Sequence, residues 1–585
     1  MGAAPGRTQE QCKSKEQAPG LKPGRYNGRY NGNGRARAYT AGMGAAGTRM
    51  VADDLVMGAL RRYWGYEEFR PRQQRIVRAI LDGRDVCVIM PTGGGKSLCY
   101  QLPAALLGER TAIVVSPLIA LMQDQVAQLS LMGIPSAFLN STISQNEQAA
   151  IIKGARAGAY RLLYLSPERL ARADTVEWLR SLPISFFAID EAHCISEWGH
   201  EFRPEYRQMS SLRKHFSDVP IAAFTASATQ RVRHDIIAQL KLREPEKFIA
   251  SFHRPNLNYI VKECEGKEQD ALLLKALKKY ADSSVIIYAS TIKGVESTVE
   301  TLEEEGIAAL PYHGKMDADT RRVNQEKWTS DEVLVMVGTN AFGLGINKAA
   351  VRAVIHLALP KSIEQYYQEA GRAGRDGLAS ECLLLWKRKD AGTLAYFAGQ
   401  IQDAAEKSRA WDRYHEIMGF GEGEECRHKL ICKHFGETKT WESCGACDVC
   451  LGVPSWFAQG SAKNGAAVRA TAEAWQDKAA QDKLARDSKR VRSAASIPTG
   501  GIAKDLREYL REWRRDMAKK QGMPAFIVMH DTTLDAICLQ QPENMKEMGR
   551  IPGIGEKKLE LYGQEVLDAL RRFSGGARPR SGPEA

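Results

Sequence analysis

The sequence predicts an α/β protein with two tandem lobes, each a doubly wound parallel sheet, followed by a small cysteine-rich helical segment and a small all-α C-terminal domain. Three observations support this fold class. Apolar runs of strand length alternate with helical segments from about residue 53, the alternation restarts at about residue 248, and only helical spacings recur after residue 503. Such alternation is typical of parallel sheets, whose ligands bind at the carboxyl ends of the strands.

A chain of 585 residues is too long for a single core, and we expect three or four domains. The predicted divisions are a disordered basic Gly/Arg-rich arm (1–52), a first lobe (53–247), a second lobe (248–395), a cysteine-rich helical segment (396–452), a linker (453–502), a helical domain (503–573) and a disordered tail (574–585).

Positive charge is concentrated in the N-terminal arm. The chain has 82 Lys and Arg against 70 Asp and Glu, and residues 1–50 alone hold nine basic and two acidic residues. The arm has too few apolar residues to offset the entropy of ordering it, and Met43 or Met50 is an alternative start. The charge favours a polyanionic partner, without deciding between nucleic acid and a membrane surface.

Cysteine usage indicates a reducing compartment. Five of the twelve cysteines lie between Cys426 and Cys450 and the rest are scattered, whereas a disulfide framework would spread them evenly. The sequence has no signal peptide and no apolar run of about eighteen residues. We therefore expect a soluble protein of the cytosol or nucleoid, or of the nucleus in a eukaryote, without a membrane partner.

A glycine loop between a strand and a helix is the centre of the first lobe. An apolar run (86–89) precedes the loop and a helical pattern (98–107) follows; the loop reads Thr92, Gly93, Gly94, Gly95, Lys96, Ser97. Consecutive glycines let backbone N–H groups face a phosphate chain at a helix N-terminus. Lys96 would then reach the β- and γ-phosphates of ATP, and the Ser97 hydroxyl would bind Mg²⁺. A flexible turn is the alternative, since Met90 replaces a usual glycine.

Residues just before this loop have the chemistry that adenine recognition needs. Tyr66 can stack on the base, Gln73 can form two hydrogen bonds with its edge, and Arg70 adds a cation. A helix with its capping loop is the commoner explanation of such a stretch.

Two adjacent carboxylates follow a predicted buried strand. Further strands of the first lobe are expected at 112–115, 162–165, 186–189 and 221–224. Asp190 and Glu191 end the third of these, so Asp190 would hold Mg²⁺ and Glu191 would orient or deprotonate the attacking water. The alternative is an acidic helix N-terminus. It is less favoured because the Lys96 loop lies upstream, and the two motifs together indicate a nucleotide site.

An aromatic-rich stretch comes next and suggests a contact with single-stranded nucleic acid. Its stacking, hydrogen-bonding and phosphate-binding side chains are Trp198, His200, Phe202, Arg203 and Tyr206. Aromatics at a spacing of four are usually core residues, but a Gly and a Pro within the stretch favour a loop. Residues 225–229 would relay the nucleotide state to this loop.

The second lobe lacks a glycine loop but carries two arginines. Its strands are expected at 284–288, 333–337 and 354–357. Arg372 and Arg375 share one helix face or turn, and arginines donated across an interface to a γ-phosphate can contribute about 10³ to 10⁵ in rate. A salt-bridged helix end is the alternative.

The clustered cysteines indicate a metal site. Cys426, Cys444, Cys447 and Cys450 would bind Zn²⁺ as four thiolates in a closed, structural site. In alternative ligand sets Cys432, His428 or His434 replaces one of these cysteines, and an iron–sulfur cluster is a second competitor.

The C-terminal part divides into a linker and a helical domain. The polar linker is expected to be partly helical around 466–486. In the helical domain, the turn at Gly553 and Gly555, followed by Lys557 and Lys558, could hold a DNA phosphate. A protein-contact or spacer role has equal weight.

Together these stretches resemble a superfamily-2 helicase and, in detail, the RecQ family. The segments that carry the resemblance are residues 64–73, 92–97, 116–125, 166–170, 190–206, 225–229, 338–348 and 365–377. The aromatic-rich loop directly after Asp190–Glu191–Ala192–His193 is the most diagnostic, because other helicases with that motif lack it. The resemblance covers roughly residues 53–452, and the C-terminal region resembles the HRDC accessory domain.

The resemblance implies RecA-like lobes with ATP between them and 3′-to-5′ DNA unwinding in recombination, repair and the SOS response. It supports Zn²⁺ as the metal and Cys426 as one of the ligands. The spacing of Cys426 from the other cysteines differs by one residue from the commonest spacing in the family. Ser227 and Ala289 depart from the usual motif residues without touching the catalytic groups. The linker is too short and polar for the winged-helix domain that often follows the zinc segment in this family.

The expected partners are single-stranded and partly duplex DNA, with a single-strand-binding protein or repair proteins as further candidates, and a monomer is favoured. Two other functions remain open on the sequence: an RNA helicase with the same Asp-Glu-Ala-His motif, and a DNA-binding module without unwinding activity.

Overall fold

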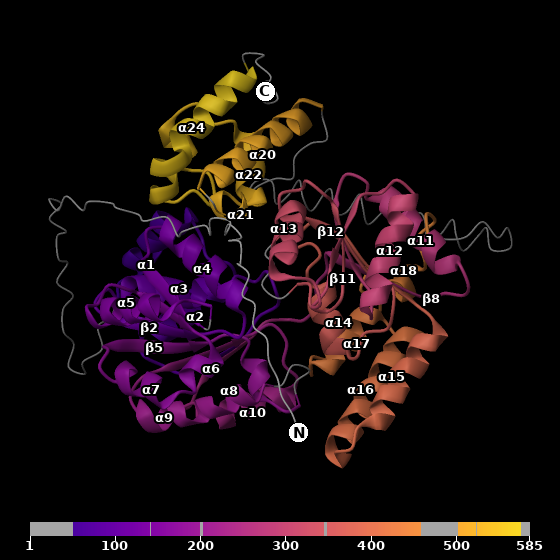
Figure 1. The fold of residues 1–585 in the computed structure, drawn as a ribbon, viewed down its shortest axis with the longest axis horizontal. Coiled ribbons are helices and arrows are strands. Elements are labelled where there is room, and N and C mark those ends of the chain that lie inside the picture. The colour runs from indigo at the N-terminus through magenta and orange to yellow at the C-terminus, as the bar shows by residue number, and fades with distance from the viewer. Residues whose placement is uncertain are drawn as a thin grey trace, which may run out of the picture.

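The computed structural model describes residues 51–140, 142–198, 203–343, 348–457, 501–521, 523 and 525–574. Two parallel sheets lie side by side, one in each lobe, and the helical domain covers the junction between them (Figure 1). The predicted fold class is therefore confirmed. The predicted arm up to residue 50, the helix around 466–486 and the tail from 575 lie outside the described residues.

Lobe 1 is built on a seven-stranded sheet with the order β3-β4-β2-β5-β6-β1-β7. All its pairings are parallel, and the central strands are buried because helices cover both faces. The strands are β1 Val86–Ile89, β2 Thr111–Val115, β3 Ser136–Leu139, β4 Leu162–Leu165, β5 Ile184–Ile189, β6 Ile221–Thr225 and β7 Glu246–Ile249.

The helices of lobe 1 connect these strands in alternation, as parallel pairing requires. They are α1 Asp53–Ala59, η1 Leu60–Trp64, α2 Gln73–Leu81, α3 Lys96–Leu106, α4 Ile119–Leu131, α5 Gln145–Arg156, α6 Pro167–Leu170, α7 Ala173–Leu179, η2 Ala192–Ile195, α8 Pro204–Arg207, η3 Gln208–Ser211, α9 Leu212–His215 and α10 Gln230–Gln239.

Lobe 2 contains a six-stranded parallel sheet with the order β10-β11-β9-β12-β13-β8. Its strands are β8 Leu257–Glu263, β9 Ser284–Tyr288, β10 Ala309–Tyr312, β11 Val335–Gly338, β12 Val351–His356 and β13 Ser380–Trp386. Its helices are α11 Glu268–Lys279, α12 Ile292–Glu304, α13 Ala318–Thr329 and α14 Ile363–Ala370.

The predicted strands correspond to observed ones, with small shifts at their ends. The run expected at 333–337 is β11, which begins two residues later, and the run expected at 354–357 is β12, which begins three residues earlier. Five further strands, β3, β7, β8, β10 and β13, were not among those expected. Three of them are short edge strands with polar residues or a proline, which weakens their apolar signal.

The cysteine-rich segment extends the core of lobe 2. Its helices are α15 Arg388–Gln400, α16 Ala404–Glu422, α17 Arg427–His434 and α18 Asp448–Leu451. One buried apolar cluster continues from one face of each lobe sheet into this segment and includes Phe420, Ile431 and Phe435. In Figure 1, α15 and α16 form a helical hairpin that projects from the lobe.

The C-terminal helical domain has an apolar core of its own, which includes Leu510, Leu534 and Val566. Its helices are α20 Gly501–Gln521, α21 Ala525–Val528, α22 Asp531–Gln540, α23 Met545–Met548 and α24 Glu556–Ser574. Helix α21 packs against α4 of lobe 1 and α13 of lobe 2. None of the described helices is both long and apolar enough to cross a bilayer.

The cysteine-rich segment is fastened to lobe 2 by a buried histidine at the end of α17. The ring nitrogens of His434 lie 2.6 Å from a carboxylate oxygen of Glu364 in α14 and 3.1 Å from one of Glu416 in α16. Burial alone would lower the pKa of His434, but the two carboxylates outweigh it and raise the pKa to about 10. His434 is therefore a cation at neutral pH.

Replacing His434 with Gln should lower the stability of the protein in a pH-dependent way. The folded pKa of about 10 exceeds the ordinary value of 6.5, so the stabilisation is fully present below pH 6.5 and is lost as the pH rises toward 10. We expect a loss of about 2–4 kcal/mol at pH 6.5, since the variant leaves the buried carboxylate of Glu364 without its cation. Thermal melting between pH 6 and 10 measures this, with exposed His415→Gln as the control. A pH-independent difference would contradict the assignment.

Candidate active site and metal centre

The glycine loop joins β1 to α3 in the lobe cleft. Gly93 and Gly95 have φ angles of 82° and 81°, which favour glycine over other residues. A Cβ at Gly95 would lie 2.3 Å from Nε2 of Gln73, so the close approach also requires glycine. The loop thus wraps tightly and ends at the N-terminus of α3, where backbone N–H groups and the helix dipole favour an anion.

Lys96 begins α3 and faces the cleft. Its Nζ donates to the carbonyl oxygen of Met90 over 3.1 Å. Burial in the cleft lowers the pKa of Lys96, and the nearby carboxylates of Glu191 and Asp190 oppose that shift. The ammonium therefore lies within electrostatic reach of both predicted acids, although these acids are distant in sequence.

The predicted adenine-binding residues lie next to the loop, but Gln73 is engaged by the chain itself. Its Oε1 accepts from the backbone N–H of Arg70 over 2.9 Å, and its Nε2 donates to the carbonyls of Gly94 and Gly95 over 3.2 Å each. Both ends of the amide that were expected to bond the base edge are thus engaged by the chain in this structure, one with Arg70 and the other with the loop. Tyr66 is 36% exposed and lines the same cavity.

Asp190 and Glu191 follow β5, as the motif predicts. Burial first, and then repulsion from Glu191, raise the pKa of Asp190 to about 7, while Lys96 opposes the rise. Glu191 has a left-handed backbone, with a φ angle of 47°. Strain of this kind in a non-glycine residue often occurs at functional sites.

A polar chain leads from Glu191 to the second lobe. The Nδ1 of His193 lies 3.3 Å from Oε2 of Glu191 and 2.9 Å from the hydroxyl of Thr225. The Thr225 hydroxyl donates to the carbonyl of Ser227 over 3.1 Å, and Nε2 of Gln368 in α14 donates to the Ser227 hydroxyl over 2.9 Å. These contacts connect the acid motif with lobe 2.

The two predicted arginines of lobe 2 face the glycine loop of lobe 1. A Cβ at Gly93 would lie 3.2 Å from Cγ of Arg375, so the loop and this side chain are in contact. The guanidinium of Arg372 donates to the carbonyl of Gly343. Burial, and then the charges of Arg372 and Arg254, lower the pKa of Arg375 to about 9. Such a concentration of cations favours an anionic ligand.

Arg254, which sequence reasoning missed, bridges the two lobes. It lies between β7 and β8 and donates to the carbonyls of Ala373 and Gly374 over 3.2 and 3.1 Å. It also donates to the carbonyl of Thr92 in the glycine loop over 3.5 Å. Its position could not be found from a motif, because a single arginine in a connecting segment has no local signature.

A cavity of about 500 Å³ unites these residues. Its walls come from lobe 1, lobe 2 and, unexpectedly, the helical domain. Predicted site residues on the walls are Tyr66, Arg70, Gln73, Thr92, Gly93, Gly95, Lys96, Ser97, Asp190, Glu191, Arg372 and Arg375. Further lining residues, which were not predicted for this nucleotide site, include Asp124, Gln368, Phe526, His530 and Lys558.

The aromatic stretch after the acid motif is only partly a set of open stacking faces. The ring of Trp198 packs against the chain's own arginines, with the guanidinium carbons of Arg231 and Arg409 3.0 and 4.9 Å from its centroid. Arg203 is partly buried and donates to the carbonyl of Pro117 over 3.5 Å. His200 and Phe202 lie outside the described residues.

The expectation that Tyr206 offers a stacking face is wrong. Its side chain is fully buried, with 0% exposure, and its hydroxyl donates to the backbone carbonyl of Asp190 over 3.0 Å. Aromatics spaced by four residues often belong to the core, and this one does. Tyr206 therefore holds the backbone of the acid motif in place through this hydrogen bond with Asp190.

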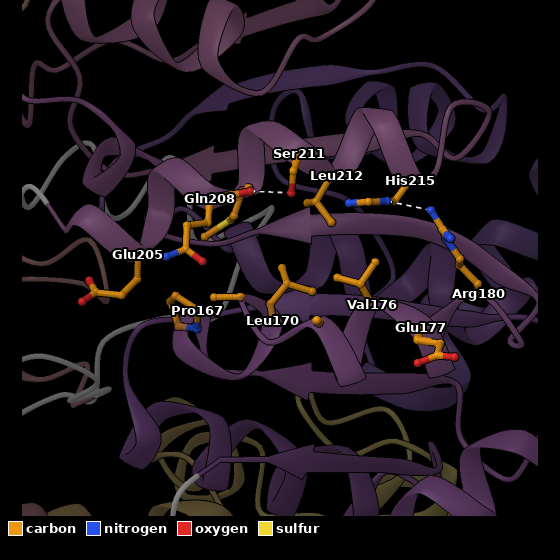
Figure 2. A pocket seen from close by; sticks show the side chains of 13 residues that line it. Pro167, Leu170, Val176, Glu177, Arg180, Glu205, Gln208, Ser211, Leu212 and His215 are labelled. Carbon is orange, nitrogen blue, oxygen red and sulfur yellow. Dashed lines mark hydrogen bonds between the residues drawn. The ribbon is translucent and has the colours of Figure 1, made fainter.

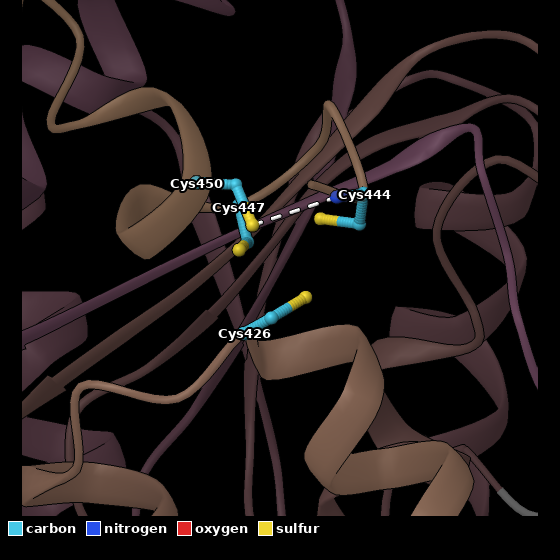
Figure 3. Close-up of side chains that lie close together, drawn as sticks. All are labelled: Cys426, Cys444, Cys447 and Cys450. Carbon is cyan, nitrogen blue, oxygen red and sulfur yellow. Dashed lines mark hydrogen bonds between the residues drawn. The ribbon is translucent and has the colours of Figure 1, made fainter. Parts of the chain in front are cut away.

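Four thiols gather where the cysteine motif predicts (Figure 3). The four residues are Cys426, Cys444, Cys447 and Cys450, and their Sγ atoms all lie within 4.8 Å of one another. Gly445 has a φ angle of 61°, which allows the turn between two of them. Four soft ligands at this separation suit Zn²⁺, whose structural sites are tetrahedral. It is the single metal-binding group found among the described residues.

The two histidines that were named as alternative metal ligands are otherwise occupied. His428 forms a 3.1 Å hydrogen bond with the carbonyl of Leu257 in β8, and His434 pairs with two carboxylates, as described above. Asp448, beside the thiols, accepts from Arg427 over 3.0 Å and from the backbone N–H of Val261 over 2.9 Å. The four-cysteine cluster is therefore anchored on β8 of lobe 2.

A second cavity, of about 460 Å³, lies on lobe 1 between α6, α7, α8 and α9 (Figure 2). Its walls include apolar Leu170, Val176 and Leu212, and Arg180 lies 2.7 Å from Nδ1 of His215 at its rim. It contains none of the predicted site residues.

Four family models match successive parts of the chain. They are a DEAD/DEAH box helicase model over residues 70–236, a helicase conserved C-terminal domain over 268–377, a RecQ zinc-binding model over 388–451 and an HRDC domain over 503–570.

Related proteins match along most of the chain. The ATP-dependent DNA helicase RecQ of Bacillus subtilis is 33% identical over 583 residues, which cover 88% of this chain and 98% of that protein. The protein of the same name from Haemophilus influenzae is 34% identical and covers 90% and 97%. The ATP-dependent DNA helicase Q-like 2 of Arabidopsis thaliana is 40% identical and covers 66% and 56%. With these matches and the order of its four domain models, the chain belongs to the RecQ family of helicases.

Proposed function

We propose that this protein is an ATP-dependent DNA helicase that unwinds duplex DNA by moving 3′ to 5′ on one strand. The observation that carries the proposal is the composite cavity, in which Lys96, Asp190 and Glu191 of lobe 1 lie opposite Arg372 and Arg375 of lobe 2. A site divided between two lobes changes shape when the lobes move, so nucleotide binding and release can drive motion.

Within this cavity we assign a role to each predicted residue. The loop backbone and Lys96 bind the phosphates, and Glu191 orients or deprotonates the attacking water. Ser97 and Asp190 would hold Mg²⁺, since hydroxyl and carboxylate oxygens suit that ion. When bound, the ion would neutralise charge that develops on the phosphates. Arg372 and Arg375 would stabilise the same charge from lobe 2.

The polar chain from Glu191 offers a route by which hydrolysis could reach the DNA-binding side. His193 lies between the acid and Thr225, and Ser227 is hydrogen-bonded to Gln368 of lobe 2. A change at the γ-phosphate that moves Glu191 would alter this connection. We propose that residues 225–229 transmit the nucleotide state, as their sequence position suggested.

The DNA strand would cross both lobes near the aromatic loop. Arg203 and the loop that follows Trp198 supply a cation and further polar and aromatic groups for single-stranded DNA. Arg409 reaches Trp198 from α16, so the zinc segment supports the loop. Participation in recombination and repair, action as a monomer, and contacts with a single-strand-binding protein are further parts of the proposal.

The RNA-helicase alternative has less support, because the relatives that match over most of the chain are named DNA helicases. A binding module without unwinding activity would not need acids and arginines from two lobes in one cavity.

Strand displacement on DNA and RNA substrates, with and without ATP, tests the proposed function. We expect ATP-dependent displacement of DNA that carries a 3′ single-stranded tail and none with a 5′ tail. Lys96→Ala should lower ATP hydrolysis by roughly 10² or more, because it removes the cation from the phosphates, yet leave DNA binding within about twofold. Exposed Lys153→Ala is the matched control. ATP turnover retained in Lys96→Ala, or displacement of RNA alone, would refute the proposal.

The four-cysteine site should act on stability, because four thiolates leave no open position for chemistry. Cys447→Ser should lose the bound zinc and lower the melting temperature, while ATP turnover of the protein that stays folded at low temperature changes less than about threefold. Metal analysis and thermal melting measure both effects. Cys432→Ser is the control, since this buried thiol lies outside the cluster. Zinc lost equally from both variants would contradict the ligand set.

A further inference from the structure

The helical domain is docked on both lobes. On lobe 1 a Cβ at Gly65 would lie 2.5 Å from the carbonyl oxygen of Ile554, and a Cβ at Gly555 would lie 2.5 Å from that of Tyr63. The two backbones therefore touch, and Arg62 adds a 2.9 Å ion pair with Glu556. The turn at Gly553 and Gly555 thus packs against lobe 1, which favours the protein-contact role that the sequence left open beside DNA binding.

On lobe 2 the helical domain is held by buried charges. Arg511 in α20 lies 3.1 Å from a carboxylate oxygen of Asp331, whose other oxygen lies 2.8 Å from Nζ of Lys348. The side chains of Asp331 and Lys348 are 5% and 1% exposed, so removing one partner would leave an unpaired buried charge. The helical domain therefore has a fixed position over the cleft.

In that position the domain forms one wall of the nucleotide cavity. Phe526, His530, Pro552, Gly553 and Lys558 all line it. Because the domain touches lobe 1 directly before Tyr66, this wall stands at the end of the cavity where the base and sugar are expected. Lys96, which is expected to bind the phosphates, lines the cavity from the start of α3.

Lys558 is the unusual member of this wall. It is 4% exposed, and burial lowers its pKa to about 8. Among the described residues no carboxylate pairs with it, whereas its neighbour Lys557 is 49% exposed and lies 2.8 Å from Glu560. Burial, and then the charge of Lys558, lower the pKa of His530 to about 4, so this neighbour is neutral and adds no second positive charge to the wall.

A buried ammonium without a counter-ion is costly, and a cavity beside it that takes an anion removes that cost. We propose that Lys558 is a nucleotide-binding residue, with which the helical domain contacts the sugar and α-phosphate end of the bound nucleotide. The inference rests on the proposed ATP site and adds a third structural unit to it. Since the same domain holds Asp331 of lobe 2, nucleotide binding and domain docking should strengthen each other.

Titration of the full-length protein with ADP in the absence of DNA tests this role. Lys558→Met keeps the buried stem and removes the charge, and we expect it to raise the Kd for ADP about tenfold. Lys557→Met, the adjacent exposed lysine, should stay within twofold of the wild type. An unchanged Kd in Lys558→Met, together with a weakened Lys96→Ala, would overturn the role of Lys558 and leave the ATP site intact. ADP binding that Lys96→Ala does not weaken would instead refute the ATP site itself.

Lys558→Arg separates charge from packing. It keeps the cation, so its Kd should return to within about threefold of the wild type, even where the Met variant loosens the domain. Melting curves of the three variants report whether the helical domain stays folded. An Arg variant as weak as the Met variant, with both melting like the wild type, would show that the charge does not contact the nucleotide.

Discussion

The electrostatic balance of one cleft organises this molecule. Lys96 and two acids of lobe 1 share a cavity with Arg372 and Arg375 of lobe 2, and burial, followed by the charges of Arg372 and Arg254, lowers the pKa of Arg375. Like charges at this density are tolerated because the carboxylates oppose them in part, and an anionic ligand would complete the balance. The proposed closure of the lobes around a nucleotide would supply that anion.

Several contacts join the two lobes across the cleft. Gly93 touches Arg375, Arg254 bridges the glycine loop and the arginine turn, and Gln368 reaches Ser227 across the lobes. Each contact is a hydrogen bond or a van der Waals contact at the junction, where a small displacement breaks or remakes it. The zinc segment and the helical domain are each held to lobe 2 by charged groups, His434 with Glu364 and Arg511 with Asp331.

Local motifs predicted the centre of the site well. The glycine loop and the acid pair each follow a buried strand, and parallel strands bring their carboxyl ends to one edge, so Lys96 and Asp190 had to meet. Tyr206 was misjudged because its spacing fits both a loop and a core, and only packing distinguishes them. Strand β13 is fully buried and could have been found from its apolar run.

The remainder depends on contacts between distant parts of the chain. Arg254 stands alone in a connecting segment, and the place of Lys558 is set by backbone contacts between Gly65 and Ile554 that no local pattern announces. Gln73 was identified, but its partners in the loop depend on the path of Gly94 and Gly95. Domain docking was the least predictable feature, since a helical domain with its own core could sit anywhere.

The central claim is that lobe 2 completes the hydrolysis site, and single-turnover ATP hydrolysis by Arg375→Ala tests it most directly. Hydrolysis should fall by about 10³, while the affinity for a non-hydrolysable ATP analogue changes only a few-fold. Arg322→Ala, an exposed arginine of the same lobe, should behave like the wild type. Hydrolysis by Arg375→Ala within twofold of the wild-type rate would show that lobe 1 acts alone and would contradict the account.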